Sequence, residues 1–538
     1  MKKSIIDKHI DALVANDFLF FILEKWRISS GEHLGEPYSF RERPYMKGIV
    51  EDNFHNVVIQ KSAQCGISEV EVARAIWNAI YRKRNVLYTM PAGEQMQQFV
   101  DSRARNAIVN SDFLSQHVTG SLNLKKFSIA NHQIYFRGVQ KRRQIISVDV
   151  STLCADELDE YEEGTLNTLE KRLGASKTPE KHMFSTPSFH GTGVSLLYYG
   201  SDALREKGSD QRVWTIKCSH CGQWNEDLYW ETNVIDLNEK DNKSSYYEPN
   251  VIVICRFCKK EIDRLTANAE WVAKNPSITG VCHGYHISKL FSPTGDLNQM
   301  WLDSQNPIKE QEFYNSDLGM PYEPRGSRLT DDAILSATGT HLIVRKSDTP
   351  TYAGVDIGKK IHMIVAENDS NNRIKVIAAM ELDDWTELHL VAQDFKVGGM
   401  VIDMNPEKDE AVKFQKKHDN AWLAYYAQHL ETKVEKFVKN YDDQVVALNR
   451  TLMMMLTSDM VMDKNVIFPL DLRRVRDFYE HLKSPIKAQK QSAQGEWVTF
   501  YPKTKNPDHY YHALLYTLMA SQLRSRPALV KFVSTLLR

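Results

Sequence analysis

The sequence predicts an α/β protein of two successive domains, each built on a sheet of short apolar strands. In the N-terminal half these strands alternate with segments of helical periodicity, which is typical of a parallel sheet with helices on both faces. Two C-x-x-C pairs interrupt the alternation, and a second group of strands that carry aspartate begins after residue 350. A chain of 538 residues has room for two or three hydrophobic cores.

Composition excludes several classes of protein. The chain is 42% hydrophobic and 25% charged with a formal net charge of −1, so any contact with nucleic acid must come from local basic patches. The apolar run Phe18–Leu23 is too short to span a bilayer, and no signal-peptide pattern is present. Of seven cysteines, four form the two C-x-x-C pairs and three are single. This usage favours a reducing cytoplasm over a disulfide framework.

The stretch Val57–Ser68, VVIQKSAQCGIS, organises the first domain. Its first four residues predict a buried strand, and Ser68 opens a segment whose apolar residues recur at helical spacing. A strand, a tight loop and a helix N-terminus form a cradle for phosphate, because backbone N–H groups and the helix dipole converge there. A common loop of this kind has the pattern G-x-x-x-x-G-K-[ST].

The match to that pattern is partial. Gly66 and Ser68 stand at the second glycine and the hydroxyl, but Ile67 replaces the lysine. Lys61 stands where the first glycine belongs, followed by Ser62, and a lysine side chain is long enough to reach phosphate from there. A deviant phosphate-binding loop and an ordinary strand–loop–helix are therefore both open.

Two further apolar strands are predicted to end beside this loop. The segment Ile145–Tyr161 contains a strand that ends in Asp156 and Glu157, at the edge where open α/β sheets bind ligands. Asp156 would hold Mg²⁺ and Glu157 would polarise the attacking water of a nucleotide hydrolase. An acidic helix start is the alternative, and we favour hydrolysis. The strand His182–Pro187 ends in Ser-Thr-Pro, where Thr186 would sense a γ-phosphate or belong to a turn.

A basic stretch lies between these strands. It would contact DNA or place an arginine at a neighbouring subunit's nucleotide, although a solvated surface is the simpler interpretation. Its members are Lys125, Lys126, Arg137, Lys141, Arg142 and Arg143.

The two C-x-x-C pairs are the most specific pattern in the chain. Four thiolates, from Cys218, Cys221, Cys255 and Cys258, match the tetrahedral set that Zn²⁺ prefers. We therefore predict a structural zinc ribbon inserted at about residues 212–265, with a redox dithiol as the alternative.

The second domain is predicted to begin after a connector. The strand Thr351–Ile357 carries Asp356, and a strand pair with a central carboxylate is how ribonuclease-H-like nucleases begin. Such nucleases hold two metal ions with several carboxylates. Asp403 ends a further strand, and Asp508 and His512 stand four residues apart, hence on one helical face. A metal site and ordinary turn residues are equally open.

Taken in this order, the motifs resemble those of the large terminase subunit of tailed bacteriophages, in particular its lambda-type branch. KSAQCGISEVEVA is similar to that branch's P-loop, ADELDEY to its Walker B motif and STPSFHGTG to its coupling motif. CSHCGQWN resembles its zinc-ribbon insertion, and YAGVDIG resembles the start of its nuclease.

The resemblance implies four regions. They are an ASCE-type P-loop ATPase domain at residues 1–330, a linker at 331–350, a ribonuclease-H-like nuclease domain at 351–525 and an amphipathic tail at 526–538. The tail would be a last core helix or a segment that docks on a partner.

The resemblance also implies the site residues. Glu157 would be the catalytic carboxylate of the ATPase, and Asp356 and Asp403 would be catalytic metal ligands of the nuclease. The family's last motif has aspartate where this chain has His512, and histidine is a poorer Mg²⁺ ligand. Either Asp508 supplies the missing carboxylate, or the nuclease is weakened or prefers Mn²⁺. The implied residues for ATP and its Mg²⁺ are Lys61, Ser62, Gly66, Ser68, Asp156 and Thr186.

The function implied by the resemblance is a packaging motor that cuts concatemeric viral DNA and pumps it into a procapsid. Its expected partners are double-stranded DNA, a portal protein, a small terminase subunit and further copies of the chain in a ring, in the host cytoplasm. Two other functions compete with it. One is a helicase-like ATPase without cleavage, and the other is a zinc-stabilised DNA-binding adaptor with a decayed P-loop.

Overall fold

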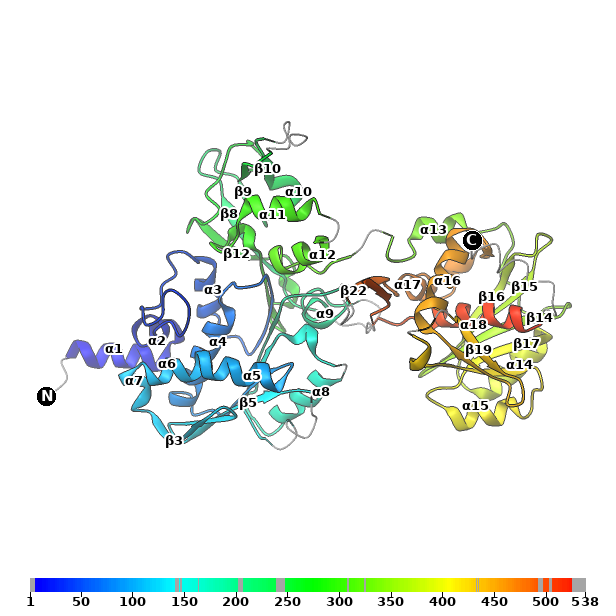
Figure 1. The fold of residues 1–538 in the computed structure, drawn as a ribbon, viewed down its shortest axis with the longest axis horizontal. Helices are drawn as coiled ribbons and strands as arrows, with labels where there is room; N and C mark the ends of the chain where they lie inside the picture. Colours follow the sequence, from blue (N-terminus) through cyan, green and yellow to red (C-terminus); the bar gives the residue numbers. More distant parts are fainter. Residues whose placement is uncertain are drawn as a thin grey trace. The chain divides into compact units, whose positions relative to one another are not determined.

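The computed structural model divides the chain into two compact units, Met1–Glu323 and Pro324–Arg538, each with its own sheet (Figure 1). Among the helices that the structure describes, none combines the length and apolar character that a bilayer crossing needs. The described residues are 5–140, 145, 148–162, 164–201, 207–238, 247–306, 309–323, 326–431, 433, 435–491, 497–502 and 506–524.

The first unit is built on a large sheet whose central strands are parallel. Its strands are β1 (Asn56–Lys61), β2 (Val86–Met90), β3 (Val118–Asn123), β4 (Lys126–Ile129), β5 (His132–Gly138), β6 (Thr152–Asp156), β7 (Glu180–Ser185), β8 (Arg212–Lys217), β9 (Trp224–Glu226), β12 (Ala269–Ala273) and β13 (His283–Ile287). They lie in the order β12-β8-β13-β1-β7-β6-β2-β5-β4-β3, with β9 paired to β8. Neighbouring strands from β13 to β5 are parallel, so their carboxyl ends share one edge.

Helices cover both faces of this sheet. Ile59 of β1 belongs to the large core that includes helix α4, whereas Val58 belongs to the core on the opposite face with helix α9. This alternation follows from the two-residue period of a strand. The helices of the unit are α1 (Ile5–Asn16), α2 (Phe18–Glu24), α3 (Tyr45–Glu51), α4 (Ile67–Ile80), α5 (Gly93–Phe99), α6 (Asn106–Val109), α7 (Asp112–Ser115), α8 (Thr165–Glu170), α9 (Gly193–Tyr199), α10 (Trp230–Asn233), α11 (Leu297–Ser304) and α12 (Glu310–Glu312). A small antiparallel pair, β10 (Val234–Asp236) and β11 (Val251–Val253), lies beside α11.

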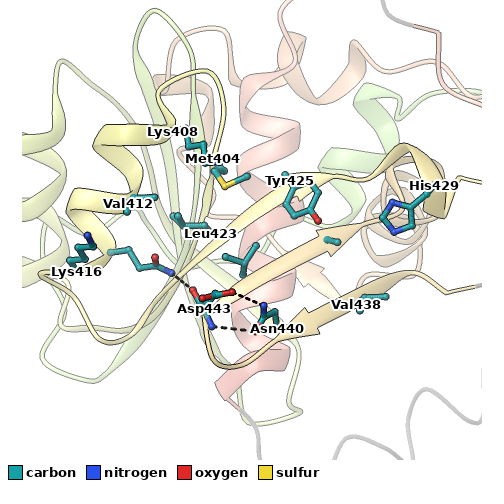
Figure 2. A pocket seen from close by; sticks show the side chains of 13 residues that line it. Met404, Lys408, Val412, Lys416, Leu423, Tyr425, His429, Val438, Asn440 and Asp443 are labelled. Carbon is teal, nitrogen blue, oxygen red and sulfur yellow. Dashed lines mark hydrogen bonds between the residues drawn. The ribbon is translucent and has the colours of Figure 1, made fainter.

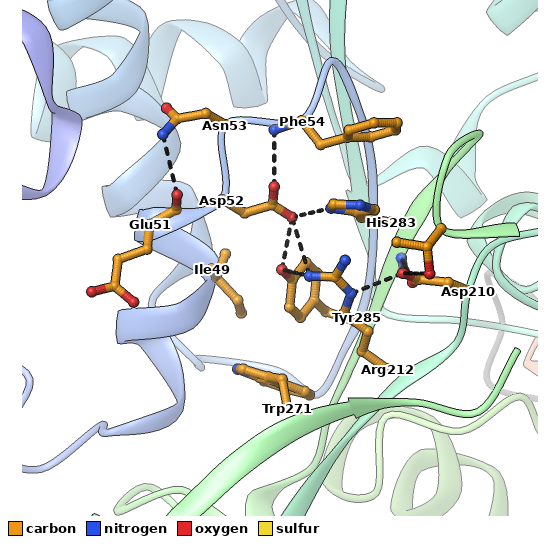
Figure 3. Close-up of polar contacts among 12 residues, drawn as sticks. Ile49, Glu51, Asp52, Asn53, Phe54, Asp210, Arg212, Trp271, His283 and Tyr285 are labelled. Atoms are coloured by element: carbon orange, nitrogen blue, oxygen red, sulfur yellow. Dashed lines mark hydrogen bonds and ion pairs between the residues drawn. The ribbon is translucent and has the colours of Figure 1, made fainter. Parts of the chain in front are cut away.

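A polar network joins the end of α3 to β13 at the amino-terminal end of β1 (Figure 3). The Asp52 carboxylate accepts hydrogen bonds from Tyr285 Oη at 2.7 Å and from the backbone N–H of Phe54 at 2.9 Å, and lies 2.7 Å from His283 Nδ1. Arg212 contacts the same carboxylate at 3.7 Å. Burial disfavours the carboxylate, but the Tyr285 and His283 bonds outweigh it and lower the pKa of Asp52. The network fixes the segment that leads into β1.

The second unit contains a mixed sheet. Its strands are β14 (Thr351–Ile357), β15 (Ile361–Asn368), β16 (Ile374–Leu382), β17 (Val397–Asp403), β18 (Ala421–Tyr426), β19 (Phe437–Asn440), β20 (Val445–Leu448) and β21 (Val466–Ile467). They lie in the order β19-β20-β18-β17-β14-β15-β16-β21. β14, β15 and β16 form an antiparallel meander, and β17 pairs parallel with β14 on its other side. A separate hairpin joins β22 (Ala488–Gln491) and β23 (Trp497–Phe500).

Helix α18 lies very close to β14 because of a glycine. A Cβ atom on Gly354 would lie 2.1 Å from both Ala513 O and Thr517 N of α18, so no larger residue fits there. This approach places the start of α18 near the aspartate of β14. The helices of this unit are α13 (Asp331–Ser336), α14 (Trp385–Asp394), α15 (Lys408–Gln415), α16 (Arg450–Met462), α17 (Phe478–Lys483) and α18 (His509–Arg524). α14 and α15 cover the opposite face of the sheet from α18.

The stretch 331–350, predicted as a linker, is part of the second unit instead. It contains α13, whose Ile334 is fully buried in the core with α16 and α18, and Thr338 pairs with Phe468. Ile334 and Ala337 account for the difference, because they bury apolar surface that a connector would expose. The predicted tail at 526–538 lies outside the described residues.

Candidate active sites

The predicted strand–loop–helix is present in the first unit. β1 ends at Lys61, and α4 begins at Ile67 with Gly66 as its N-terminal cap. Gly66 has φ +95°, a left-handed conformation that favours glycine. The loop therefore turns sharply into a helix N-terminus, the geometry that binds phosphate.

Two contacts join this loop to the acidic end of β6. Lys61 Nζ lies 3.1 Å from Glu157 Oε1, and Ser68 Oγ donates to Asp156 Oδ2 at 2.9 Å. β7 pairs with both β1 and β6, so the parallel sheet brings these ends together. Burial disfavours the Lys61 ammonium, but the charge of Glu157 outweighs it and raises the pKa of Lys61. The structure thus brings together four residues that the sequence predicts as parts of one nucleotide site.

The Asp156 side chain is suited to a cation. It is 1% exposed, and its Oδ1 atom has no hydrogen-bond partner, whereas Oδ2 also accepts from Tyr88 Oη at 2.8 Å. Burial raises the pKa of Asp156 to about 6 although Lys61 opposes the shift. A buried carboxylate oxygen without a partner, beside the Ser68 hydroxyl, fits the all-oxygen coordination of Mg²⁺.

Two other predicted residues lie at the same edge with different roles. The backbone N–H of Ser62 donates to Ile287 O at 2.8 Å, so it is already engaged, while the buried Ser62 hydroxyl has no partner. Thr186 follows β7 directly, and its carbonyl accepts from Ser185 Oγ at 2.9 Å. Both residues therefore lie at the edge of the site, whereas Lys61 and Ser68 join the loop to the acidic end of β6.

Sequence reasoning missed how the N-terminal segment binds α4. Glu69, in the first turn of that helix, accepts hydrogen bonds from Trp26 Nε1 at 2.8 Å, from Ser29 N at 2.9 Å and from Ser29 Oγ at 2.5 Å. Arg43 also lies beside the loop, with Cδ and Nε 3.8 Å from where a Cβ of Gly66 would stand. No local pattern indicates these contacts, because the partners stand some 20 to 40 residues apart in the sequence.

The four paired cysteines converge on one point. Cys218 Sγ lies 3.8 Å from Cys258 Sγ, Cys221 Sγ lies 3.7 Å from Cys255 Sγ, and all four sulfur atoms lie within 4.8 Å of one another. Tetrahedral Zn²⁺ with bonds of about 2.3 Å requires sulfur–sulfur distances of about 3.8 Å, so the residues fit this ion.

N–H groups surround these sulfurs. Asn225 Nδ2 donates to Cys255 Sγ at 3.5 Å, and the backbone N–H of His220 donates to Cys218 Sγ at 3.4 Å. Burial opposes the thiolate of Cys255, but N–H groups of Cys258 and Asn225 outweigh it and lower its pKa to about 6. Such outer bonds stabilise metal-binding thiolates.

In the second unit, two predicted aspartates lie together. Burial and the negative charge of Asp356 raise the pKa of Asp403 to about 7. His509 Nδ1 lies 2.8 Å from Asp356 Oδ2, and this bond raises the pKa of His509. Two carboxylates that repel each other fit a shared divalent cation, which removes the repulsion.

Asp508 and His512 do not join these aspartates as one ligand set. His512 Nε2 lies 3.1 Å from Asp508 Oδ2, and its Nδ1 lies 2.5 Å from Tyr426 Oη. Both ring nitrogens are therefore engaged, because Asp508 precedes α18 by one residue and shares a face with His512. Within the described part of the chain, only the four cysteines form a group of three or more His, Cys, Asp or Glu residues whose ligand atoms all lie within 4.8 Å of one another.

Comparison with known proteins agrees with this geometry. Residues 34–273 match the family model of the ATPase domain of the phage terminase large subunit gpA. The large terminase subunit of Escherichia phage lambda is 22% identical over 356 residues, which cover 59% of this chain and 54% of that protein. Residues 34–273 are therefore similar to the ATPase domain of the lambda-type large terminases. The chain matches about half the length of the lambda protein. Its fold is similar to the crystal structure of the HK97 bacteriophage large terminase, with TM-score 0.55 and 11% identity over 95% of this chain and 99% of that one.

Sequence reasoning also missed two histidines near the predicted metal ligands Asp356 and Asp403. His362 stacks on His509 with ring centroids 4.6 Å apart, and His481 lies 5.6 Å from the same ring. Burial and the charge of His509 lower the pKa of His362 to about 3 and that of His481 to about 4. They come from β15 and α17, so their spacing in the sequence gives no signal.

A groove in the second unit is not lined by these carboxylates. A cavity of about 680 Å³ opens between α15 and β18, β20 and β19 (Figure 2). Leu423 and Tyr425 of β18 line it, whereas Tyr426 contacts His512 on the other face of the sheet. Lys408 and Lys416 flank the groove, and it is separate from the aspartate pair.

The described part of the basic stretch lines an open groove on the first unit. Lys125, Lys126, Tyr135 and Arg137 border about 630 Å³, and the Arg137 guanidinium stacks 5.5 Å from the Tyr135 ring. Residues 141–143 of the predicted stretch lie outside the described residues.

Proposed function

We propose that this chain is the motor of viral DNA packaging, in which ATP hydrolysis drives double-stranded DNA into a procapsid and a metal-dependent endonuclease cuts concatemeric DNA. The observation that supports it most is the pair of contacts from Lys61 to Glu157 and from Ser68 to Asp156. These contacts place a cation, a hydroxyl and two carboxylates at a helix N-terminus, as hydrolysis of a nucleoside triphosphate requires.

In the first unit each residue would have a distinct task. Lys61, with Ser62 and Gly66, would bind the β- and γ-phosphates of ATP, and Ser68 with Asp156 would hold Mg²⁺. The ion would neutralise charge on the phosphates. Glu157 would orient and polarise the attacking water, and release of Lys61 from Glu157 would free both side chains when the nucleotide enters.

Thr186 would sense the γ-phosphate at the end of β7. This strand lies between β1 and β6, so its carboxyl end borders both halves of the site. A group placed there can report whether the γ-phosphate is present.

In the second unit Asp356 and Asp403 would hold Mg²⁺ or Mn²⁺, and the ion would supply Lewis-acid chemistry for phosphodiester hydrolysis. His509 orients Asp356 through its 2.8 Å contact. Asp508 and His512 would support the site from α18 rather than bind the first ion, because they bind each other and Tyr426.

The same proposal assigns partners and place. As a terminase, the chain would act with a small terminase subunit and a portal protein, as a ring of copies on a procapsid in the host cytoplasm. The groove lined by Lys125, Lys126 and Arg137 would contact DNA phosphates, since basic side chains beside an aromatic ring suit a nucleic-acid backbone.

One experiment tests both activities. The wild type and the variants Lys61→Ala, Glu157→Gln and Asp356→Ala are assayed for ATP hydrolysis and for nicking of plasmid with Mg²⁺ or Mn²⁺. We expect the first two to lose ATPase by about 100-fold or more and the third to lose nicking to the same extent. Normal ATP hydrolysis by Lys61→Ala would refute the nucleotide site, and normal nicking by Asp356→Ala would favour the helicase-like alternative.

The cysteine cluster would hold one structural Zn²⁺. Metal analysis of the purified protein is expected to find about one zinc per chain, and chelation is expected to unfold residues 212–265. Folded, zinc-free protein would exclude this assignment.

A further inference from the structure

Asp159 connects two loops that the proposed ATPase cycle requires to communicate. It lies in the short 3₁₀ helix Leu158–Glu160 that follows the catalytic carboxylate. Asp159 Oδ1 accepts from Ser188 N and Ser188 Oγ, both at 2.9 Å, and Oδ2 accepts from Val194 N at 2.8 Å. The backbone N–H of Asp159 donates to Ser185 Oγ at 3.2 Å. One residue therefore binds the coupling motif at three points.

The fit around this carboxylate leaves no space. Gly193, at the start of α9, has φ +43°, and a Cβ atom there would lie 2.4 Å from Asp159 Oδ2. Only glycine permits both this backbone conformation and this approach. The Asp159 carboxylate thus occupies the space that a side chain at position 193 would need. A shift of this carboxylate would therefore displace the loop 186–192 that precedes the helix.

The far side of that loop is attached to the end of the first unit. Tyr322 N donates to Ser188 O at 2.9 Å, and Phe189 pairs with Tyr322 as a parallel bridge. Tyr322 stands one residue before Glu323, where the first unit ends. Asp159, Ser188 and Tyr322 therefore form a continuous hydrogen-bonded chain from the catalytic loop to the segment that leads into the second unit.

We propose that Asp159 is a positioning residue that transmits the state of the nucleotide site to the coupling loop, and through Ser188 to Tyr322. The inference rests on the proposed function, since it assumes that residues 156–157 respond to ATP. Glu157 has φ +53°, a conformation that non-glycine residues seldom adopt, so the turn that carries Asp159 is tightly bent. A small rotation at Glu157 would displace Asp159 with it.

Hydrogen exchange with a non-hydrolysable ATP analogue tests the proposal on the full chain. In the wild type we expect the analogue to change exchange in residues 186–192 and 320–323. Asp159→Asn places an amide N–H group against the Val194 or Ser188 donors, so the link is broken while the phosphate contacts remain. We expect Asp159→Asn to bind the analogue within about twofold of the wild type and to lose the exchange change by about tenfold.

Glu160→Gln is the matched control, because it removes a charge from the same short helix at an exposed side chain. It is expected to retain the full nucleotide-dependent change. If the analogue binds the wild type and Asp159→Asn still transmits the change, the proposal is wrong. If the wild type does not bind the analogue, the proposed function itself fails, and the proposal fails with it.

A second variant separates a link from a merely structural contact. Gly193→Ala disrupts the same contact from α9, so it is expected to lower the nucleotide-dependent exchange change by about the same factor as Asp159→Asn. The double variant is expected to lose no more than either single variant, with the KM for ATP unchanged. Additive losses would mean that the two residues act independently and would overturn the proposal.

Discussion

The two proposed active sites differ in what neutralises their carboxylates. In the first unit Glu157 pairs with Lys61 and Asp156 accepts from Ser68, so opposite charges and hydroxyls are already in place. In the second unit Asp403 faces the like charge of Asp356. His509 Nδ1 contacts Asp356, and the backbone N–H of Asn405 donates to Asp403 Oδ1 at 3.0 Å, but no side-chain cation comparable to Lys61 is among these contacts. The first site is assembled by the protein alone, whereas the second needs a cation to be electrostatically balanced.

The difference follows from how each fold builds its site. Three adjacent parallel strands bring the ATPase residues to one edge, and the register of a sheet fixes their positions. The proposed nuclease residues come from β14, β17 and α18, and the packing of that helix on the sheet and on α16 and α17 holds the last of these in place. The nuclease should therefore be more sensitive to packing, metal and pH.

The largest expected effect comes from Gly354→Ala. Its Cβ would collide with the backbone of α18 at Ala513 and Thr517, so the helix must move and carry His509 away from Asp356. We expect about 3 kcal/mol of destabilisation of the second unit and loss of nicking. Thermal unfolding and plasmid nicking measure this, and ATPase is expected to stay within about twofold.

Gly93→Ala is the control for that change, since nothing lies within 4 Å of its Cβ position. It should leave both activities intact. Unchanged nicking in Gly354→Ala would show that α18 does not position the nuclease site.

A smaller effect is expected from His509→Ala. Removing the imidazole leaves Asp356 without the contact that orients it, and such supporting residues change metal affinity by about 10- to 100-fold. The midpoint of Mg²⁺ or Mn²⁺ titration of nicking should rise by that factor. His389→Ala is a suitable comparison, because this histidine pairs with His418 elsewhere in the same unit. Equal metal midpoints in the two variants would contradict the assignment.

Much of this arrangement was predictable from the sequence, and the limits have physical causes. The strand ends at Lys61, Asp156 and Asp403 follow from local apolar runs and turn residues. The first two lie together because the carboxyl ends of parallel strands share one edge of the sheet. The convergence of the four cysteines was also predictable, because two C-x-x-C pairs can supply the four thiolates of one tetrahedral zinc site. By contrast, the contact of His509 with Asp356 joins residues 153 positions apart, and no local pattern encodes it.

The pair predicted as nuclease ligands illustrates the same limit. The four-residue spacing of Asp508 and His512 correctly places them on one helical face, yet that proximity makes them partners of each other. Tyr426, from β18, takes the remaining nitrogen of His512. A sequence motif identifies which residues gather, whereas the hydrogen-bond partner of each depends on side chains from distant strands.

The pH dependence of the two activities should also differ. The pKa of Asp403 is raised to about 7 and that of Asp156 to about 6, and both carboxylates bind metal only when ionised. At limiting metal, nicking should therefore rise as pH increases through about 7, by up to about tenfold per pH unit below it, and ATPase through about 6. Initial rates from pH 5 to 9 measure both profiles.

The stability of the metal-free protein should change with pH in the opposite direction to its activity. A carboxyl whose folded pKa is raised binds its proton more tightly in the folded state, so metal-free stability falls as pH rises from about 4 to about 7. Asp403→Asn should remove this slope from the second unit. Equal slopes in the wild type and Asp403→Asn would mean that burial and the charge of Asp356 do not raise the pKa of Asp403.

The smallest effect concerns the buried charges beneath the ATPase site. His182 Nδ1 lies 3.0 Å from Glu71 Oε2, and burial is outweighed by the charge of Glu71, which raises the pKa of His182 to about 9. A histidine with a raised pKa stabilises the fold fully below about 6.5, and this stability is lost as pH rises towards 9. His182→Gln should abolish that pH dependence, on the order of 2 kcal/mol in urea unfolding of the first unit.

His55→Gln, a change at an exposed histidine, should leave the slope intact. His362 of the second unit offers a contrast, because its Nε2 lies 3.8 Å from Glu381 Oε2 and its pKa is lowered instead of raised. The second unit also contains His509, whose pKa is raised, so it should lose some stability over the same pH range. If His182→Gln kept the wild-type slope of the first unit, Glu71 would not balance this buried charge. A slope that His182→Gln removes would show that the protein balances this buried charge, as it does at the proposed ATPase site.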